Sequence, residues 1–192
     1  MTGENVLNIL KQPINAAGDD NELEIGGTMT ILSTATFSRA GRQIVTPVCG
    51  NAKVGATSGW VITAADNISQ GTLPASQTAS TLIVPITGLE IGDTLTGLSV
   101  SGQVESAGNA ATLVLSVRKT VAAAAGNTDA ELGTDNVGSL VADTLISSAT
   151  LAVTGLTEVV AEGEAFYALL TGTTAASTDI ALNSIIATIT RS

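Results

Sequence analysis

The feature that most constrains the fold is a series of short apolar segments between residues 81 and 190. Each segment is rich in β-branched residues or alternates apolar with polar positions, and the segments recur every 10–20 residues or so, at about the spacing of strands in a sandwich. Polar, Gly-containing turns separate them, and no segment of helical period lies between them, so a parallel βαβ sheet is disfavoured. The sequence therefore predicts an all-β fold, an antiparallel β-sandwich of the jelly-roll type.

Alternation is clearest at 94–105, where Leu98, Val100 and Val104 share one face, and at 111–118. We expect these two segments to form a hairpin or meander. Further strands are expected at 81–87, at 150–160 with a bend near Gly155, at 165–174 and at 180–190. Residues 121–138, first Ala-rich and then acidic, predict a long loop, and residues 140–146 are ambiguous.

The rest of the chain differs from this region in composition. The predicted divisions are an N-terminal arm at 1–26, a small β region at 27–66, a linker at 67–80 and the sandwich domain at 81–192. Within the small β region, strands are expected at 28–37, 42–48 and 59–63. Whether 27–66 forms a separate domain or adds strands to the sandwich stays open at this point.

The composition excludes several classes of function. The chain has no histidine and one cysteine, so it holds no Ser-His-Asp triad, no HExxH zinc site, no CxxC motif and no intrachain disulfide. Seven Lys and Arg against seventeen Asp and Glu give a net charge of −10, which argues against a nucleic-acid partner. One Trp, one Tyr and two Phe are too few for a groove that stacks sugars. We therefore expect a protein that is no enzyme and needs no cofactor.

The hydropathy is high for a chain of this kind. Hydrophobic residues make up 44% and charged residues 12% of the sequence, and the mean hydropathy is +0.41. The first eleven residues have no basic segment followed by a long apolar one, and no run is long enough for a spanning helix, so we expect neither a secretory signal nor a membrane partner. Few charges and short apolar side chains suit a surface buried against other subunits. Alternatively, Ala and Thr simply raise the hydropathy of an ordinary β domain.

Two groups of residues are candidates for partner binding. An apolar stripe at helical spacing on the polar arm predicts a docking segment; its members are Val6, Leu7, Ile9 and Leu10. Arg39 and Arg42 flank a turn and are expected either to pair with acidic groups of a neighbouring protein or to lie in a solvated loop.

Other residues have more local interpretations. Residues 127–136 gather Asp129, Glu131 and Asp135, in outline the oxygen ligands of calcium, but without the EF-hand pattern a solvated acidic loop is favoured. Cys49, without a histidine partner, predicts a buried or half-buried structural thiol. Trp60 predicts a core side chain, although an interface anchor is the alternative.

Two stretches resemble a known class of protein. Gly92–Asn109 (GDTLTGLSVSGQVESAGN) and Glu162–Thr174 (EGEAFYALLTGTT) are similar to segments of tailed-phage virion proteins. The region from 81 onward looks like the β-sandwich or jelly-roll modules of capsid decoration (cement) and head-fibre proteins. The resemblance implies assembly on a capsid lattice, often as trimers, with an arm that grips the shell, and it supplies no catalytic residues.

Three functional hypotheses follow. The first is a decoration protein on the capsid exterior, assembled in the host cytoplasm, that forms a homotrimer and binds the major capsid protein. The second is a receptor-binding or fibre-tip adhesin, because such modules also occur in tail fibres and cell-surface proteins. The third is a minor hydrolase with a carboxylate or metal site that would depend on Asp129 or Glu131.

Overall fold

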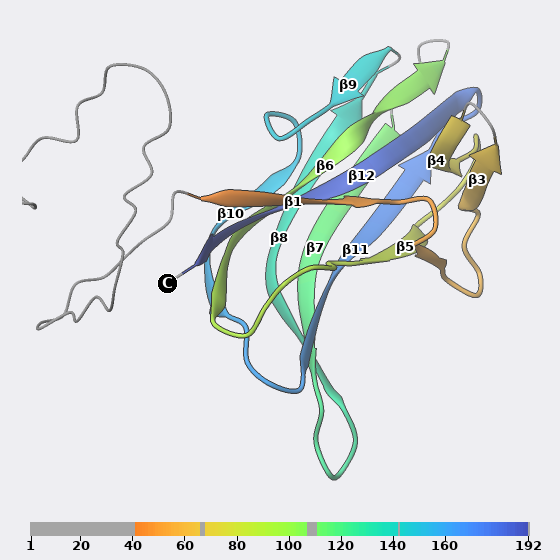
Figure 1. The fold of residues 1–192 in the computed structure, drawn as a ribbon. Coiled ribbons are helices and arrows are strands. Elements are labelled where there is room, and N and C mark those ends of the chain that lie inside the picture. The colour runs from red at the N-terminus through yellow and green to blue at the C-terminus, as the bar shows by residue number, and fades with distance from the viewer. Residues whose placement is uncertain (1–40, 66–67, 107–110, 142, 192) are drawn as a thin grey trace, which may run out of the picture. The chain divides into compact units, whose positions relative to one another are not determined.

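The computed structural model describes residues 41–65, 68–106, 111–141 and 143–191, all within one compact unit. The described residues form twelve β-strands and no helix (Figure 1). Within this part of the chain there is accordingly no helix of the length and apolar character that a membrane crossing requires. The all-β prediction is confirmed.

The strands form two antiparallel sheets. Sheet A has the order β10 (Ala152–Val159), β6 (Asp93–Ser106), β12 (Thr178–Arg191), β4 (Ile68–Leu73) and β3 (Val61–Ala65). Two further strands join it, because β1 (Arg42–Pro47) pairs with β12 and β9 (Thr144–Ile146) pairs with β6. Sheet B has the order β2 (Lys53–Val54), β5 (Ser80–Pro85), β11 (Glu164–Thr174), β7 (Ala111–Val121) and β8 (Thr128–Leu140).

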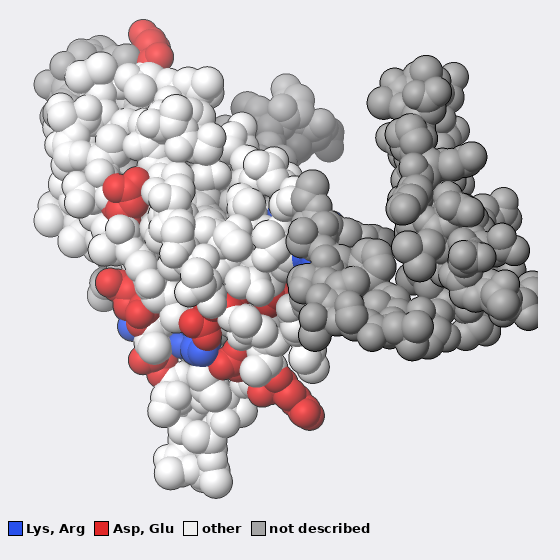
Figure 2. Space-filling model, turned by 90° about the vertical axis from the view of Figure 1, so that its left-hand side faces the viewer, with Lys and Arg blue, Asp and Glu red and all other residues white. Residues whose placement is uncertain are grey.

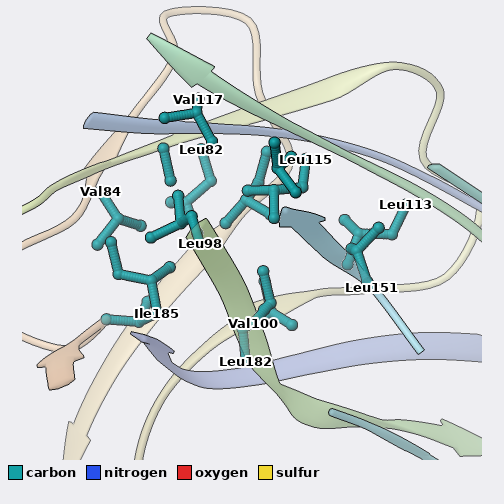
Figure 3. Close-up of a cluster of buried hydrophobic side chains, with 14 of the residues drawn as sticks. Leu82, Val84, Leu98, Val100, Leu113, Leu115, Val117, Leu151, Leu182 and Ile185 are labelled. Carbon is teal, nitrogen blue, oxygen red and sulfur yellow. The ribbon is translucent and has the colours of Figure 1, made fainter. Parts of the chain in front are cut away.

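The core lies between the inner faces of the two sheets (Figure 3). Alternate residues of each long strand point inward, as the period of two requires. Sheet A contributes Leu98, Val100, Leu182 and Ile185, and sheet B contributes Leu82, Val84, Leu113, Leu115 and Val117, all of them buried. The inward faces expected for 94–105 and 111–118 are therefore confirmed. The hairpin or meander expected of them is wrong, because β6 lies in sheet A and β7 in sheet B, so the two strands face each other across the core.

Trp60 belongs to this core. Its side chain is 3% exposed, and its indole Nε1 donates a hydrogen bond of 3.0 Å to the backbone oxygen of Ser80. A buried indole needs such an acceptor, because an unpaired N–H away from water is costly. The expectation that Trp60 is a core residue is confirmed.

A lysine joins the two sheets near one end of the sandwich. The Nζ of Lys119 in β7 forms ion pairs with Glu158 in β10 and with Glu164 in β11, the latter at 2.9 Å. The carboxylate partners hold the pKa of Lys119 above its ordinary value, and Lys119 in turn lowers the pKa of Glu164. Because β10 lies in sheet A and the other two strands in sheet B, this cluster links the layers.

An arginine fastens the last strand at the same end. Arg191 donates from Nε to Oδ1 of Asp93 at 2.7 Å and from Nη2 to Oδ2 at 3.1 Å. The backbone N–H of Glu90 also donates to this carboxylate, whose side chain is 1% exposed. These hydrogen bonds, led by that of Arg191, hold the pKa of Asp93 below its ordinary value.

The strands expected at 42–48, 59–63 and at six places after residue 80 all occur, with shifted ends. The bend near Gly155 is also present, because Gly155 has a φ of +72° and the register of β10 on β6 shifts there. The strand expected at 28–37 lies outside the described residues.

Several expectations differ from the structure. The described part of 27–66 adds β1, β2 and β3 to the two sheets, which answers the question that the sequence left open. The linker expected at 67–80 contains β4, which pairs with β3 and β12. The long loop expected at 121–138 is mostly β8, whose backbone pairs with β7 from Val121 to Ala111. In β4 and β8, backbone pairing with a neighbour forms a strand without an alternating apolar pattern.

Candidate functional site

Of the six sequence-predicted partner-binding residues, the structure describes Arg42. Val6, Leu7, Ile9, Leu10 and Arg39 lie outside the described residues. Arg42 opens β1 and is exposed. Its positive charge contributes to the low pKa of Asp93, so it faces the end of the sandwich where Arg191 lies. The structure brings Arg42 to that end, and its role toward a partner stays a prediction.

The acidic segment at 127–136 is a strand rather than a calcium-type loop. Asp129 and Glu131 lie on the outer side of β8, whereas Asp135 accepts a hydrogen bond of 2.9 Å from the backbone N–H of Ala152 in β10. Among the described residues, no group of three or more acidic or thiol side chains is arranged to hold a metal ion. The extended backbone spaces these carboxylates apart and directs them to different partners.

The outer side of sheet B, called face B here, carries an ion-pair cluster. Arg118 Nε lies 3.2 Å from Asp129 Oδ1, and its Nη1 lies 3.5 Å from Glu131 Oε2. The Tyr167 hydroxyl donates to Asp129 at 2.6 Å, and the Ser116 hydroxyl donates to Glu131 at 2.7 Å. Each carboxylate therefore has partners on the sheet itself.

The titration of this cluster reflects its hydrogen bonds. The Tyr167 hydroxyl, followed by Arg118, lowers the pKa of Asp129. Burial, followed by the bond to Asp129, raises the pKa of Tyr167. Both groups are thus held in their ordinary neutral-pH states, Asp129 as carboxylate and Tyr167 as phenol, and neither is poised to exchange a proton near pH 7.

The central part of the outer side of sheet A, called face A here, has a different chemistry. The register of the strands places outward side chains from six strands side by side; for example, Gln43, Thr188, Gly97 and Thr154 form one row across β1, β12, β6 and β10. The residues of face A are Gln43, Val45, Pro47, Val61, Thr63, Gln70, Thr72, Gly97, Ser99, Ser101, Gln103, Ala152, Thr154, Ser184, Ile186 and Thr188. None of these sixteen residues is charged, in a chain whose net charge is −10. Beyond the row of Gln103 and Thr72, the same side of the sheet carries Asp179 of β12.

Face A is also open to contact. Val45 is 58% and Val61 is 54% exposed, although both are large apolar side chains. A hollow of about 120 Å³ is lined by Gly97 together with Gln43, Thr154 and Thr188. Hydroxyl, amide and methyl groups without a base or nucleophile suit binding rather than catalysis.

Sequence reasoning missed face A as a site. Its single signal was the set of polar, uncharged positions that alternate with the apolar ones, such as Ser99 and Ser101 in β6. That signal does not show which strands are neighbours in the sheet. The uncharged face forms only because strand order and register bring these residues together.

The side chain of Cys49 is half-buried, as expected for a structural thiol. It is separated from β1 by Val48 and lies in the turn that leads to β2.

No protein-family model and no curated protein matches this chain. Among solved structures, a low-affinity xylan-binding module of Roseburia intestinalis is similar, with 13% identity over 77% of this chain and 96% of that one and a TM-score of 0.39. The CBM22-1–GH10 modules of Clostridium thermocellum xylanase 10B share 16% identity over 78% of this chain and 26% of that one, with a TM-score of 0.37.

The enzymatically active domain of tailspike protein 4 of bacteriophage CBA120 is also similar. It shares 14% identity over 76% of this chain and 19% of that one, with a TM-score of 0.32. At these scores the likenesses carry no argument about function, which has to come from the residues of this chain.

Proposed function

We propose that this chain is a non-enzymatic structural protein of a virion, a decoration protein that binds the outside of a phage capsid through face A. In this proposal its partners are the major capsid protein and further copies of itself, as a homotrimer, and it joins the shell in the host cytoplasm. The virion setting is supported by the resemblance of 92–109 and 162–174 to phage structural proteins.

The observation that carries the proposal is the absence of charge on face A. Removing a charged side chain from water costs far more than removing a hydroxyl or a methyl group. The buried centres of protein interfaces are accordingly depleted of charged residues. In a chain with seventeen acidic residues, a face of sixteen uncharged positions is the part of the surface best suited to be covered.

The charged groups elsewhere support a non-enzymatic role. Arg118, Lys119 and Arg191 form ion pairs within the sandwich, and the carboxylates Asp129 and Glu131 are engaged by neighbours on face B. A hydrolase would need a carboxylate free to protonate or attack a substrate. The proposal therefore treats these groups as structural.

The test is co-sedimentation of the purified chain with capsids of the phage that encodes it. Val45→Glu places a charge on face A, and we expect at least ten-fold weaker binding, which corresponds to about 1.4 kcal/mol. The matched control is Val54→Glu, which changes an exposed valine of a short strand in sheet B. Unchanged thermal unfolding of both variants shows that folding is intact.

Two outcomes overturn the proposal. One is a wild-type chain that never sediments with its capsids. The other is equal loss of binding by both variants, because a surface other than face A would then make the contact.

Face B favours a second function, that of a receptor-binding or fibre-tip adhesin. Tyr167 lies there beside Arg118, Asp129 and Glu131, and an aromatic ring among charged hydrogen-bonding groups is a common setting for a sugar. A glycan array with wild type and Tyr167→Ala separates this function from the first. Binding that disappears in the variant supports it, and an empty array removes it.

A further inference from the structure

Strand β1 forms an open edge of sheet A. Within the described parts of the chain it pairs only with β12, alongside which Figure 1 shows it in orange. The register between the two strands runs from Arg42 to Pro47 without a shift, so β1 contains no bulge. The side of β1 that faces away from β12 is therefore the edge of a regular strand.

One hydrogen bond shows which way the backbone groups of β1 point. The N–H of Val48 donates to the Asn183 oxygen at 2.9 Å, in the continued register of β1 on β12. Hydrogen-bonded pairs alternate along an antiparallel ladder, so Ile44 and Thr46 also direct their N–H and C=O groups toward β12. The residues between them direct theirs away from the sheet.

Gln43 and Val45 present these outward backbone groups. Both residues are exposed, Val45 to 58%. Among the residues that the structure describes, no hydrogen bond reaches their two N–H and two C=O groups. Pro47 has the same orientation, and its oxygen accepts a hydrogen bond of 3.0 Å from Asn51 Nδ2. A proline is tolerated there because its missing N–H would have faced away from the sheet.

Most other edges of the two sheets are protected against strand addition by shortness, charge or cover. β9 has three residues, and β2 has two and begins with Lys53. β8 carries Asp129 and Glu131, and its Asp135 accepts from the Ala152 N–H of β10, which closes that side of the sandwich. Figure 2, viewed from the side on which β10 lies in Figure 1, shows acidic and basic side chains gathered on its lower half. By contrast, β1 carries no charge after its first residue.

The β1 edge is also continuous with face A. Gln43, Val45 and Pro47 are residues of that face, and Gln43 lines the hollow beside Gly97. β3 is an uncharged outer strand as well, but β4 separates it from β12 and it contributes nothing to the hollow. A partner that covers the row from Gln43 across β12 therefore also reaches the open edge of β1.

We infer that an extended segment of the capsid protein adds to β1 as a further strand of sheet A, hydrogen-bonded to the backbone of Gln43 and Val45. An added strand satisfies the free donors and acceptors of an edge, which side-chain contacts on a face do not. The occupant is the capsid protein because the edge and face A share residues. The inference rests on the proposed function and adds main-chain hydrogen bonds to that contact.

The test removes one N–H from the open edge. Val45→Pro keeps three side-chain carbons but has no N–H, and β1 already holds a proline two residues further on. We expect at least about ten-fold weaker co-sedimentation with capsids of the phage that encodes the chain, because a partner carbonyl is left unpaired. Val45→Ala keeps the N–H and loses two carbons, so it should weaken binding less than Val45→Pro. Unchanged thermal unfolding of both variants shows that they fold.

Hydrogen exchange of the wild-type chain gives a second test, which depends on no variant. When capsids are added, mass spectrometry of a peptide spanning 41–48 should show two newly protected amides, those of Gln43 and Val45. The amides of Ile44 and Thr46 are already bonded to β12 and should change little. Protection of Val61–Ala65 without protection of this peptide would place the added strand on β3 and overturn the inference.

The variants separate this inference from the proposed function. If Val45→Glu weakens binding and Val45→Pro does not, face A binds the capsid and the added strand is overturned. Equal losses for Val45→Ala and Val45→Pro also overturn it, because the side chain would then explain both. A lower mass of free Val45→Pro by light scattering would put a second copy on the edge instead. A wild type that never sediments with capsids overturns both proposals.

Discussion

Gly102 shows how far a single residue is constrained by the sandwich. It lies in β6 against β12, and a Cβ there would meet the Ala181 carbonyl oxygen and lie 3.0 Å from the Cα of Leu182. Both contacts are with backbone, which cannot rotate away. Gly138 is also a strand glycine, in β8, but a Cβ added there would have no other atom within 4 Å.

We predict that Gly102→Ala lowers the free energy of unfolding by about 2 kcal/mol or more, because β6 and β12 must separate. Gly138→Ala should change it by less than about 0.5 kcal/mol. Urea denaturation followed by Trp60 fluorescence measures both values. Equal effects of the two substitutions would contradict the close approach at Gly102.

Lys119 is important at the scale of elements, because one side chain connects strands of both sheets. Glu164, one of its partners, has a side chain that is only 10% exposed. Without Lys119 its carboxylate would lose its ion-pair partner and gain little hydration in return.

We predict that Lys119→Met lowers the free energy of unfolding by about 1–2 kcal/mol, less than for a fully buried pair because the cluster is partly solvated. The matched control is Lys53→Met in β2, for which no ion pair is described and a change below about 0.5 kcal/mol is expected. Thermal unfolding of the two variants compares them directly, and indistinguishable midpoints would show that the cluster contributes nothing.

The fastening of β12 to β6 by Arg191 and Asp93 predicts a dependence on pH. Because the pKa of Asp93 is below its ordinary value of 3.8 in the folded state, its contribution to stability is present above about pH 4 and is lost as the pH falls. Asp93→Asn should be less stable at neutral pH. It should also lose less stability than wild type between about pH 5 and about pH 3. Melting temperatures across that range test this, and parallel curves would contradict it.

At the scale of the whole molecule, strands from the first and last described parts of the chain share one core. β12 pairs with β1, β4 and β6, and residues 41–65 contribute to both sheets. Such long-range pairing requires large loops to close, at a cost in chain entropy, before the stabilising contacts form. We therefore expect slow folding for a domain of this size.

We also predict one cooperative unfolding transition for residues 41–191. Trp60, the single tryptophan, is buried in the core and reports on the part of the chain before β5. Its fluorescence and the far-UV circular dichroism should give coincident midpoints in urea. An earlier midpoint for Trp60 would mean that residues 41–80 unfold as a separate unit.

The sequence by itself determined the class of fold and much of the core. The alternation of apolar and polar residues is visible in the local sequence, and it identified the inward faces of β6 and β7. Gly155 likewise indicated the bend in β10. The same pattern is absent from β4 and β8, in which Gly71 and Gly133 interrupt it. These strands exist because neighbours pair with their backbones, so only the tertiary structure decided that they are strands.

The candidate site depended on tertiary structure almost entirely. The row from Gln43 through Thr188 and Gly97 to Thr154 joins residues far apart in sequence, and strand register alone makes them neighbours. Similarly, Lys119 meets Glu158 and Glu164 only because the two sheets close on each other. Composition determined that charge is scarce and mostly negative. The fold decided that Arg118, Lys119 and Arg191 pair within the sandwich and that the sixteen residues of face A carry no charge, because register and sheet packing are long-range properties.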